Sequence, residues 1–334
     1  MRAYEIVSAD GIDALSLAER PTPAPGPGEV LVRIRASSLN YRDLATVLDP
    51  VSRGLPYPRI PNSDGAGEVV EVGAGVTGFA PGDRVAGTFF QDWRDGPITQ
   101  QAMNSALGGA LDGVLADHAV LSADGLVHLP PHLDCAEGST LPCAALTAWH
   151  AIVEFGQIKA GQNVLLLGTG GVSIFALQFA AMHGARAIVT SKSDDKRAAA
   201  KKLGAWQTIN YAETPDWESA VSEMTDGAGA DLVVEVGGAG TLEKSVSAVK
   251  IGGKIGLIGV LTGGTINPTA MMRKSIRLQG IYVGSRRMFE DMNRAIAARQ
   301  LHPVIDRQFT FEDARAAFHH MQGAGHFGKI VVEM

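Results

Sequence analysis

An apolar run, a glycine cluster and a helical segment follow one another in Val164-Leu165-Leu166-Leu167-Gly168-Thr169-Gly170-Gly171-Val172-Ser173 and in Ile174 to Met182. This order predicts a strand, a tight turn and a helix. In such a turn the first glycine permits unusual backbone angles. A second glycine lets the backbone approach a pyrophosphate that sits on free N–H groups at the helix start. Gly168 and Gly170 fit these two positions, so the turn predicts a dinucleotide-binding site.

The turn departs from the full dinucleotide pattern G-x-G-x-x-G, because Ser173 stands at the third glycine. A glycine turn can also join any strand and helix of an α/β domain, so the surrounding segments decide whether this turn belongs to a dinucleotide-binding domain. Four short apolar runs alternate with helical segments: Val164 to Leu167, Ala187 to Thr190, Asp231 to Val236 and Lys254 to Ile258. Such alternation is typical of right-handed βαβ units and a parallel sheet. We therefore predict a doubly wound α/β domain that binds a dinucleotide.

Charged residues mark the ends of one helix in this region. Asp194-Asp195 open it at the positive end of the helix dipole, Lys201-Lys202 close it at the negative end, and Gly204 can adopt the left-handed cap. After residue 285 the sequence predicts a helix at 289–298, a strand near 308, a helix after 310 and a strand at 329–332. By pattern alone this tail fits either domain.

The first 130 residues have a different character. Strand-like pieces such as Val30 to Arg35 and Gly82 to Ala86 are separated by Pro/Gly clusters such as Pro21 to Gly28. This is typical of an all-β, partly barrel-like region. Leu129-Pro130-Pro131 closes the region, and we place a domain boundary there.

Composition indicates a globular protein and excludes several classes. The chain has 334 residues, of which 46% are hydrophobic and 19% charged, and this length predicts about two domains. The formal charge of -6 contains no run of like charge, so we expect no nucleic-acid partner. Two cysteines cannot form a disulfide framework, Met1 to Glu5 lacks the apolar run of a signal peptide, and no apolar stretch suffices to cross a bilayer. We expect a cytoplasmic protein without membrane contact.

The residues after the second strand bear on the choice between NAD and NADP. An acid about 20 residues beyond the glycine turn binds the ribose 2'-hydroxyl of NAD. Here the strand ends in Thr190-Ser191-Lys192-Ser193, and a lysine with hydroxyl groups suits a 2'-phosphate. The pattern favours NADP, with the alternative that Lys192 is only a solvated surface residue.

With these segments identified, the chain resembles the medium-chain dehydrogenase/reductase superfamily over essentially its whole length. The resemblance rests on Pro27 to Val32, Pro61 to Gly67, Gly82 to Val85, Leu146 to Trp149, the Gly168 turn and Phe327 to Val331. It implies an α/β fold with a GroES-like, β-rich catalytic domain built from residues 1–130 and 285–334. It also implies a Rossmann nucleotide-binding domain with a doubly wound parallel sheet, residues 131–284, inserted between them.

Zinc-dependent members of this superfamily hold a catalytic metal with a Cys-His pair, a Gly-His-Glu segment and a later cysteine. The matching positions here are Asn40 and Tyr41, Ser63 and Asp64, and Cys143, so a single cysteine remains. A catalytic zinc site needs three protein ligands. The segment 91–117, where the structural zinc lobe of the family lies, has no cysteine. We predict no metal, and we interpret Cys143 as a small buried thiol rather than a reactive group.

The chain looks closest to the zinc-independent branch, which includes quinone oxidoreductases, enoyl reductases and NADP-dependent alcohol dehydrogenases. In that branch, Lys196 and Tyr211 match positions that contact the adenosine 2'-phosphate. The glycine turn and the resemblance together assign NADP binding to Thr147, Gly168, Gly170, Gly171, Val172, Ser191, Lys192, Lys196, Tyr211, Ile258, Gly259, Val260, Gly284, Ser285, Phe327, Gly328 and Lys329.

Hydride transfer without a metal needs hydrogen-bond donors that stabilise negative charge on the substrate oxygen. The candidates are Asn40, as an amide donor, and Tyr41, as a phenolic donor and general acid. An alternative for Tyr41 is an aromatic ring that packs under the cofactor. We expect Asp43 to fix the loop, and Arg42 to be solvated or bound to a backbone carbonyl. The histidines show no metal-ligand spacing and receive no role.

The sequence thus predicts an NADPH-dependent, metal-free oxidoreductase that transfers hydride to a quinone, an activated alkene or a carbonyl compound. Two alternatives stay open: an alcohol dehydrogenase that oxidises small alcohols with NADP, and a nucleotide-binding protein without turnover. A later apolar run, Leu278 to Val283, is expected at the edge of the Rossmann sheet. An open edge strand can pair with a strand of another chain. In this family the edge strand pairs with the same strand of a second copy across a twofold axis, so we expect a homodimer.

Overall fold

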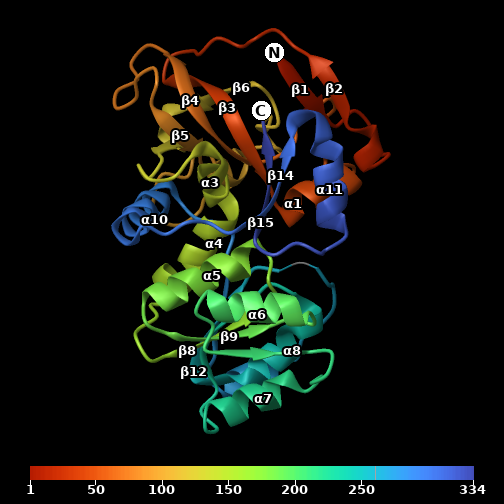
Figure 1. The fold of residues 1–334 in the computed structure, drawn as a ribbon, viewed down its shortest axis with the longest axis vertical. Helices are drawn as coiled ribbons and strands as arrows, with labels where there is room; N and C mark the ends of the chain where they lie inside the picture. Colours follow the sequence, from red (N-terminus) through yellow and green to blue (C-terminus); the bar gives the residue numbers. More distant parts are fainter. Residues whose placement is uncertain (260) are drawn as a thin grey trace. The chain divides into compact units, whose positions relative to one another are not determined.

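Figure 1 shows the computed structural model, which describes residues 1–259 and 261–334. The chain divides into two units. The first consists of Met1–Leu146 and Gly284–Met334, and the second of Thr147–Val283. Residues 131–146 and Gly284 therefore lie with the first unit, and not with the nucleotide-binding unit as the predicted boundaries had them.

A parallel sheet forms the centre of the second unit. Its strands are β8 (Asn163–Leu167), β9 (Arg186–Thr190), β10 (Gln207–Ile209), β11 (Ala230–Glu235), β12 (Val249–Leu257) and β13 (Arg277–Gly280). Within the described ranges they lie in the order β10-β9-β8-β11-β12-β13, which is the doubly wound order of a Rossmann sheet. The predicted fold class is confirmed, and the four apolar runs of the sequence correspond to β8, β9, β11 and β12.

The strand β13 lies at the edge of this sheet, but it is shorter than the predicted run Leu278 to Val283. Val283 has a φ of 57°, in the left-handed region. A strand cannot continue through such a residue, so the chain leaves the sheet before it.

Helices join the strands of this unit: α5 (Gly171–Met182), α6 (Asp194–Lys202), α7 (Trp217–Met224), α8 (Ala239–Ala248) and α9 (Pro268–Arg273). The short helix α4 (Leu146–Trp149) precedes β8 and begins at the last residue of the N-terminal part of the first unit. The residues of α5 are apolar on nearly all faces of the helix, and Phe175 and Phe179 are buried, as expected of a helix covered by other elements. The ends of α6 are those predicted. Ser193 Oγ accepts a hydrogen bond from the N–H of Lys196 (3.3 Å), and Gly204 has a φ of 100°.

A mixed sheet forms the centre of the first unit. Its strands are β3 (Glu29–Leu39), β4 (Asp64–Val72), β5 (Arg84–Gly87), β6 (His118–Ser122), β7 (Leu126–His128), β14 (Ile305–Thr310) and β15 (Lys329–Glu333). A separate pair is formed by β1 (Arg2–Glu5) and β2 (Ser16–Glu19). The C-terminal strand β15 pairs antiparallel with β3, so the tail extends the sheet that the N-terminal residues build. This agrees with the arrangement that the resemblance implied.

The helices of the first unit are α1 (Tyr41–Leu48), α2 (Gln100–Met103), α3 (Cys135–Ser139), α10 (Arg286–Arg299) and α11 (Ala314–Gln322). Residues 131–146 stay with this unit because α3 packs on β3 and β4. Ser38 Oγ also donates a hydrogen bond to the carbonyl of Ser139 (2.8 Å). Gly284 packs against Leu146, since a Cβ there would lie 2.8 Å from that side chain. No helix in the described part of the chain is long and apolar enough to span a membrane.

Candidate functional site

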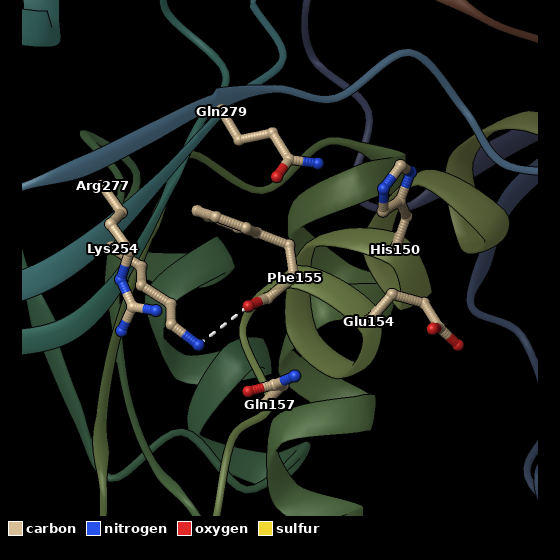
Figure 2. Close-up of a pocket in the computed structure, with 7 residues that line it drawn as sticks. All are labelled: His150, Glu154, Phe155, Gln157, Lys254, Arg277 and Gln279. Carbon is tan, nitrogen blue, oxygen red and sulfur yellow. Dashed lines mark hydrogen bonds between the residues drawn. The ribbon is translucent and has the colours of Figure 1, made fainter. Parts of the chain in front are cut away.

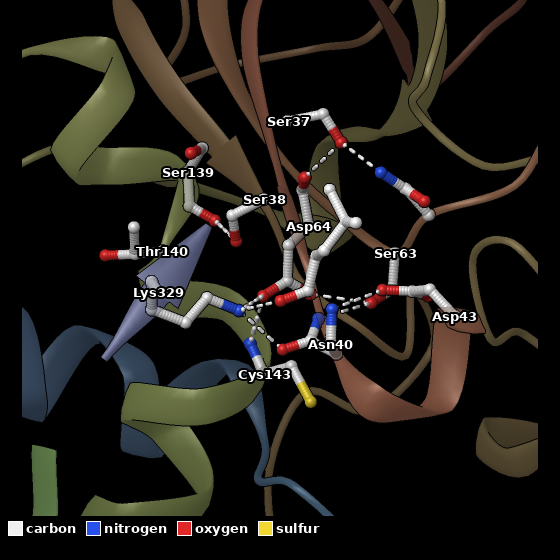
Figure 3. A network of polar contacts seen from close by, with 12 residues as sticks. Ser37, Ser38, Asn40, Asp43, Ser63, Asp64, Ser139, Thr140, Cys143 and Lys329 are labelled. Atoms are coloured by element: carbon white, nitrogen blue, oxygen red, sulfur yellow. Dashed lines mark hydrogen bonds and ion pairs between the residues drawn. The ribbon is translucent and has the colours of Figure 1, made fainter. Parts of the chain in front are cut away.

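Strand pairing brings Asn40, Asp64 and Lys329 together in the first unit. Asn40 follows β3 and caps α1, Asp64 starts β4, and Lys329 starts β15. Because β4 and β15 pair with β3 on its two sides, the three residues lie side by side. They belong to a largely buried cluster that we call the polar network (Figure 3), made of Asn40, Asp43, Ser63, Asp64, Cys143 and Lys329.

Lys329 carries the positive charge of the polar network. The residue is only 2% exposed, and its ammonium donates hydrogen bonds to the carbonyl of Leu39 (2.7 Å) and to Asn40 Oδ1 (2.6 Å). The ammonium also lies 3.9 Å from Asp64 Oδ2. A buried ammonium needs an opposite charge and hydrogen-bond acceptors of this kind. The side chain that we predicted to bind the cofactor is thus engaged inside the first unit.

Asp64 is the anion beside Lys329 and also holds the neighbouring segments. Its Oδ1 accepts a hydrogen bond from Ser63 Oγ (2.6 Å), and its Oδ2 accepts one from the backbone N–H of Cys143 (3.0 Å). Burial raises the pKa of the Asp64 carboxyl, and the Lys329 ammonium opposes that effect. Burial also raises the pKa of the Cys143 thiol, so this group stays protonated at neutral pH, in keeping with its interpretation as an unreactive thiol.

The loop formed by residues 40–43 keeps its shape through Asp43. Asp43 Oδ2 accepts the backbone N–H of Asn40 (2.9 Å), and Asp43 Oδ1 lies 3.1 Å from Arg42 Nη1. Arg42 also donates to the backbone carbonyl of Leu107 (2.6 Å). Asn40 is 8% exposed, and its Nδ2 lies 3.5 Å from Ser63 Oγ, which is a long contact. Asp43 therefore fixes the loop, as expected, and the Asn40 amide also hydrogen-bonds the Asp64 carboxylate.

Tyr41 lies at the first position of α1 and is 50% exposed. Its hydroxyl makes no hydrogen bond with any described residue. The ring therefore stands outside the polar network, and both interpretations of Tyr41 stay open.

Of the side chains at the positions that match zinc ligands, the Asp64 carboxylate and the Cys143 thiol are of a kind that zinc takes, whereas the Asn40 amide, the Tyr41 phenol and the Ser63 hydroxyl are not. The carboxylate of Asp64 is already engaged by Ser63 and a backbone N–H. Asn40 Oδ1 binds the ammonium of Lys329. Across residues 1–259 and 261–334, no group of three or more His, Cys, Asp or Glu side chains could hold a metal ion. The positive charge at this place comes from an ammonium.

The glycine turn of the second unit has the backbone geometry that its sequence predicts. Gly168 has a φ of 73°, and Gly170 precedes α5 as its cap. No atom lies within 4 Å of the place that a Cβ would take at either glycine, so the space beside them is open. The first N–H groups of α5, including those of Gly171 and Val172, have no acceptor within the helix. These groups suit an anion.

Two hydroxyl groups hold this turn in place. The N–H of Gly168 donates to Thr190 Oγ1 at the end of β9 (3.1 Å). Ser173, which stands at the third glycine position, donates from its Oγ to the carbonyl of Leu167 (2.7 Å). The serine therefore links the start of α5 to the end of β8 by a side-chain hydrogen bond, which a glycine at this position could not make.

The residues predicted at the 2'-phosphate follow neighbouring strands. Ser191 and Lys192 come after β9, Tyr211 comes two residues after β10, and Lys196 lies in the first turn of α6. Since β8, β9 and β10 are adjacent and parallel, these residues and the glycine turn share the carboxyl edge of three strands. Ser191 is buried and its Oγ accepts the N–H of Ser193 (3.3 Å), whereas Lys192 and Tyr211 are exposed.

A buried carboxylate that the sequence reasoning missed shapes the loop after β11. Glu235 accepts hydrogen bonds from the N–H groups of Gly237 (2.7 Å) and Gly238 (3.1 Å). It also accepts hydrogen bonds from the hydroxyl groups of Thr241 (2.6 Å) and Ser245. All the donors lie within ten positions along the chain. The signal that could have found it is an acid that ends an apolar strand and is followed, after one residue, by two glycines.

The predicted cofactor residues after β12 pack against this loop. The N–H groups of Ile258 and Gly259 donate to the backbone carbonyl of Glu235, at 2.8 and 2.9 Å. A Cβ on Gly259 would lie 1.9 Å from the carbonyl of Val236, so glycine is required there. Val260, which we also predicted to bind the cofactor, lies outside the described residues.

The other predicted cofactor residues make structural contacts of their own. Thr147 is buried in α4, and Ser285 Oγ caps α10 by accepting a backbone N–H (3.3 Å). The N–H of Phe327 donates to Asp306 Oδ1 (2.8 Å). Gly328 has a φ of 84°, and a Cβ there would lie 2.4 Å from a backbone carbonyl oxygen. These contacts fix the backbone, and the cofactor roles of the residues stay predictions.

Two family models match the chain. The alcohol dehydrogenase GroES-like domain matches residues 26–131, and the zinc-binding dehydrogenase matches residues 171–298. A zinc-type alcohol dehydrogenase-like protein of Schizosaccharomyces pombe is 45% identical, over 97% of this chain and 96% of that protein. A solved NAD-dependent alcohol dehydrogenase is 33% identical, with a TM-score of 0.91 and 100% of both chains covered. The quinone oxidoreductase of Pseudomonas syringae pv. tomato DC3000 is 27% identical, with a TM-score of 0.84, and covers 100% of this chain and 99% of that chain.

Proposed function

The chain belongs to the medium-chain dehydrogenase/reductase superfamily, and from this membership we propose that it is a metal-free, NADPH-dependent oxidoreductase. Its substrate would be a quinone, an activated alkene or a carbonyl compound that accepts hydride. The superfamily provides the class of reaction. The observation that carries the metal-free part of the proposal is the buried ammonium of Lys329 in the polar network.

The charge of Lys329 argues against a zinc ion at the same place. A metal ion beside Asn40 would face the ammonium, which already binds Asn40 Oδ1 at 2.6 Å. Two like charges at such a distance repel strongly in a buried site. The ammonium is balanced by Asp64, so the site has a stable charge distribution without a metal. We therefore assign the fixed positive charge of the site to Lys329.

The second unit offers a fitting place for NADPH. The open space beside the glycine turn and the free N–H groups of α5 suit the pyrophosphate. Lys192, Lys196 and Tyr211 would hold the 2'-phosphate, and β9 is followed by Ser191 and Lys192 rather than by an acid that would repel it. When bound, NADPH supplies the hydride.

Asn40 would donate a hydrogen bond to the substrate oxygen as negative charge develops there. Lys329 holds the amide oxygen of Asn40, so only the Nδ2 hydrogens could be offered to a substrate, and one of them already bonds the Asp64 carboxylate. Their contact with Ser63 Oγ is long, at 3.5 Å. A donor that is already oriented stabilises the developing charge without reorganisation. The phenol of Tyr41 would be a second donor in the same loop.

An alcohol dehydrogenase that oxidises small alcohols with NADP is the second candidate, and the names of the relatives favour it. Oxidation of an alcohol requires loss of its hydroxyl proton, which a Lewis-acidic metal assists. In this chain the Lys329 ammonium would have to assist that step from behind Asn40. We therefore rank this candidate below carbonyl, quinone or alkene reduction.

A turnover assay tests these candidates. The purified protein is mixed with NADPH and a panel of quinones, enals and aldehydes, and separately with NADP and small alcohols, while the absorbance of the reduced nicotinamide is followed. We expect turnover in the first set, less than about 0.1 equivalents of bound zinc, and unchanged rates after chelation. Turnover in the second set alone would favour the alcohol dehydrogenase, and binding without turnover would favour a nucleotide-binding protein. Stoichiometric zinc with chelator-sensitive turnover would contradict the metal-free proposal.

We also propose that the protein forms a homodimer. The edge strand β13 exposes all four of its residues, including the apolar side chain of Leu278. The outer backbone groups of an edge strand are free to pair with another chain. A second copy that pairs through the same edge would give an interface with twofold symmetry.

A further inference from the structure

A cavity of about 370 Å³ opens on the second unit, above β12 and β13 (Figure 2). Two cations, Lys254 on β12 and Arg277 on β13, form one side of it. The amides of Gln157 and Gln279 and the ring of Phe155 form other parts of the wall, and His150 and Glu154 complete the lining. The cavity is large enough for a small organic molecule.

The two cations are direct neighbours in the sheet. The parallel register places Lys254 opposite Arg277, so their side chains leave the same face of adjacent strands. Like charges directly opposite each other destabilise a sheet. In the described part of the chain, no carboxylate forms an ion pair with either of them. The nearby carboxylate of Asp231 is engaged by Lys250, and Figure 2 shows the carboxylate of Glu154 pointing away from the two cations.

Both cations and both amides retain donors that could face a ligand. The ammonium of Lys254 donates to the carbonyls of Phe155 (2.9 Å) and Gly156 (2.8 Å), which leaves one of its three hydrogens. The guanidinium of Arg277 and the side-chain amides of Gln157 and Gln279 make no hydrogen bond with any described residue. Burial, together with the charge of Arg277, lowers the pKa of Lys254.

We propose that this cavity binds a small phosphate dianion, either free or as the monoester of a small organic molecule. The dianion would lie between Lys254 and Arg277 and neutralise both charges, with the fork of the guanidinium on two of its oxygens. The amides of Gln157 and Gln279 would donate to the remaining oxygens. The ring of Phe155 would cover the organic group of a monoester. This site is separate from the glycine turn, and the inference does not depend on the proposed reaction.

Calorimetric titration and thermal unfolding test the proposal, with the glycine turn first saturated by NADP so that phosphate cannot bind there. Inorganic phosphate and glycerol phosphate are compared with sodium chloride at equal ionic strength. We expect phosphate to bind and to raise the Tm, and Arg277→Gln to weaken binding by about tenfold or more, the loss of one charge-assisted contact. The matched control Arg273→Gln removes an exposed cation of α9 outside the cavity and should bind phosphate like the unchanged protein.

A second measurement keeps the test independent of folding defects. Without phosphate and at low salt, Arg277→Gln should have a Tm equal to or above that of the unchanged protein, because the repulsion from Lys254 is gone. Added salt should remove this difference. Tighter binding of glycerol phosphate than of phosphate would identify a monoester as the ligand, and equal binding would identify free phosphate. Equal phosphate binding by Arg277→Gln and the unchanged protein, or a lower Tm of this variant without phosphate, would overturn the proposal.

Discussion

Lys329 and Asp64 illustrate how single residues determine the chemistry of the first unit. Removing one partner of a buried ion pair costs about 3–5 kcal/mol, because the other charge stays buried without compensation. The same ammonium holds the amide oxygen of Asn40, which lies 289 positions earlier in the chain. Any donor function of Asn40 therefore depends on Lys329 as well. A residue that we assigned to the cofactor acts, in this structure, on the orientation of a candidate catalytic residue.

Asn40→Ala removes the donor that the polar network orients. We expect kcat to fall about 100-fold, because a fixed hydrogen bond to the developing charge is lost. The affinity for NADPH should change little, since the glycine turn and the strand ends that we assign to the cofactor remain intact. Steady-state kinetics with a reducible substrate and a separate NADPH titration measure the two effects. An unchanged kcat would remove Asn40 from the proposed mechanism.

Tyr41→Phe distinguishes the two interpretations of the neighbouring residue, because it removes the hydroxyl and keeps the ring. If the phenol donates to the substrate oxygen, kcat falls about 100-fold. If the ring only packs, kcat stays within about threefold of its original value. Stability should be unaffected in either case, because the hydroxyl bonds to no described residue and the side chain is half-exposed. Normal turnover in both this variant and Asn40→Ala would mean that the proton comes from solvent.

At the level of secondary structure, the sequence predicted the elements that carry a long pattern. Apolar runs located β8, β9, β11 and β12, and charged ends located α6. The strand β10 has only three residues, too few for a periodic signal. The polar network could not be predicted, because it depends on the pairing of β15 with β3 from opposite ends of the chain. The length of β13 could not be predicted either, because the strand ends before Val283, whose positive φ is unusual for a β-branched residue.

The segment after β9 leads to a prediction about cofactor preference. NADPH should bind at least about tenfold more tightly than NADH, a difference of about 1.4 kcal/mol that one charge-assisted contact can provide. Lys192→Ala should reduce the preference, because it removes an exposed cation next to the proposed 2'-phosphate position. Lys202→Ala, at the other end of α6, removes an equally exposed lysine and should not. Fluorescence titrations with both cofactors measure the ratio. Equal affinities in the unchanged protein would overturn the assignment of NADP.

At the level of the whole molecule, each unit has a hydrophobic core of its own. In the first unit the core draws on both ends of the chain, from Ala3 to Val332. In the second unit it lies around the parallel sheet, with Leu165 and Val233 fully buried. In the described part of the chain, no strand pairs with the outer edge of β13. We therefore propose this strand edge, rather than either core, as the place where two copies meet.

Light scattering after size exclusion measures the assembly directly. We expect twice the 35.0 kDa of one chain at micromolar concentration, because two β13 edges can continue one sheet across a twofold axis. Leu278→Asp places a charge on that edge and should shift the population toward the single chain. Val51→Asp is the matched control, since Val51 is an exposed apolar residue of the first unit, which does not contain β13. A mass of one chain for the unchanged protein would exclude the dimer but leave the metal-free reaction and the phosphate cavity unaffected, because neither uses a residue from a second copy.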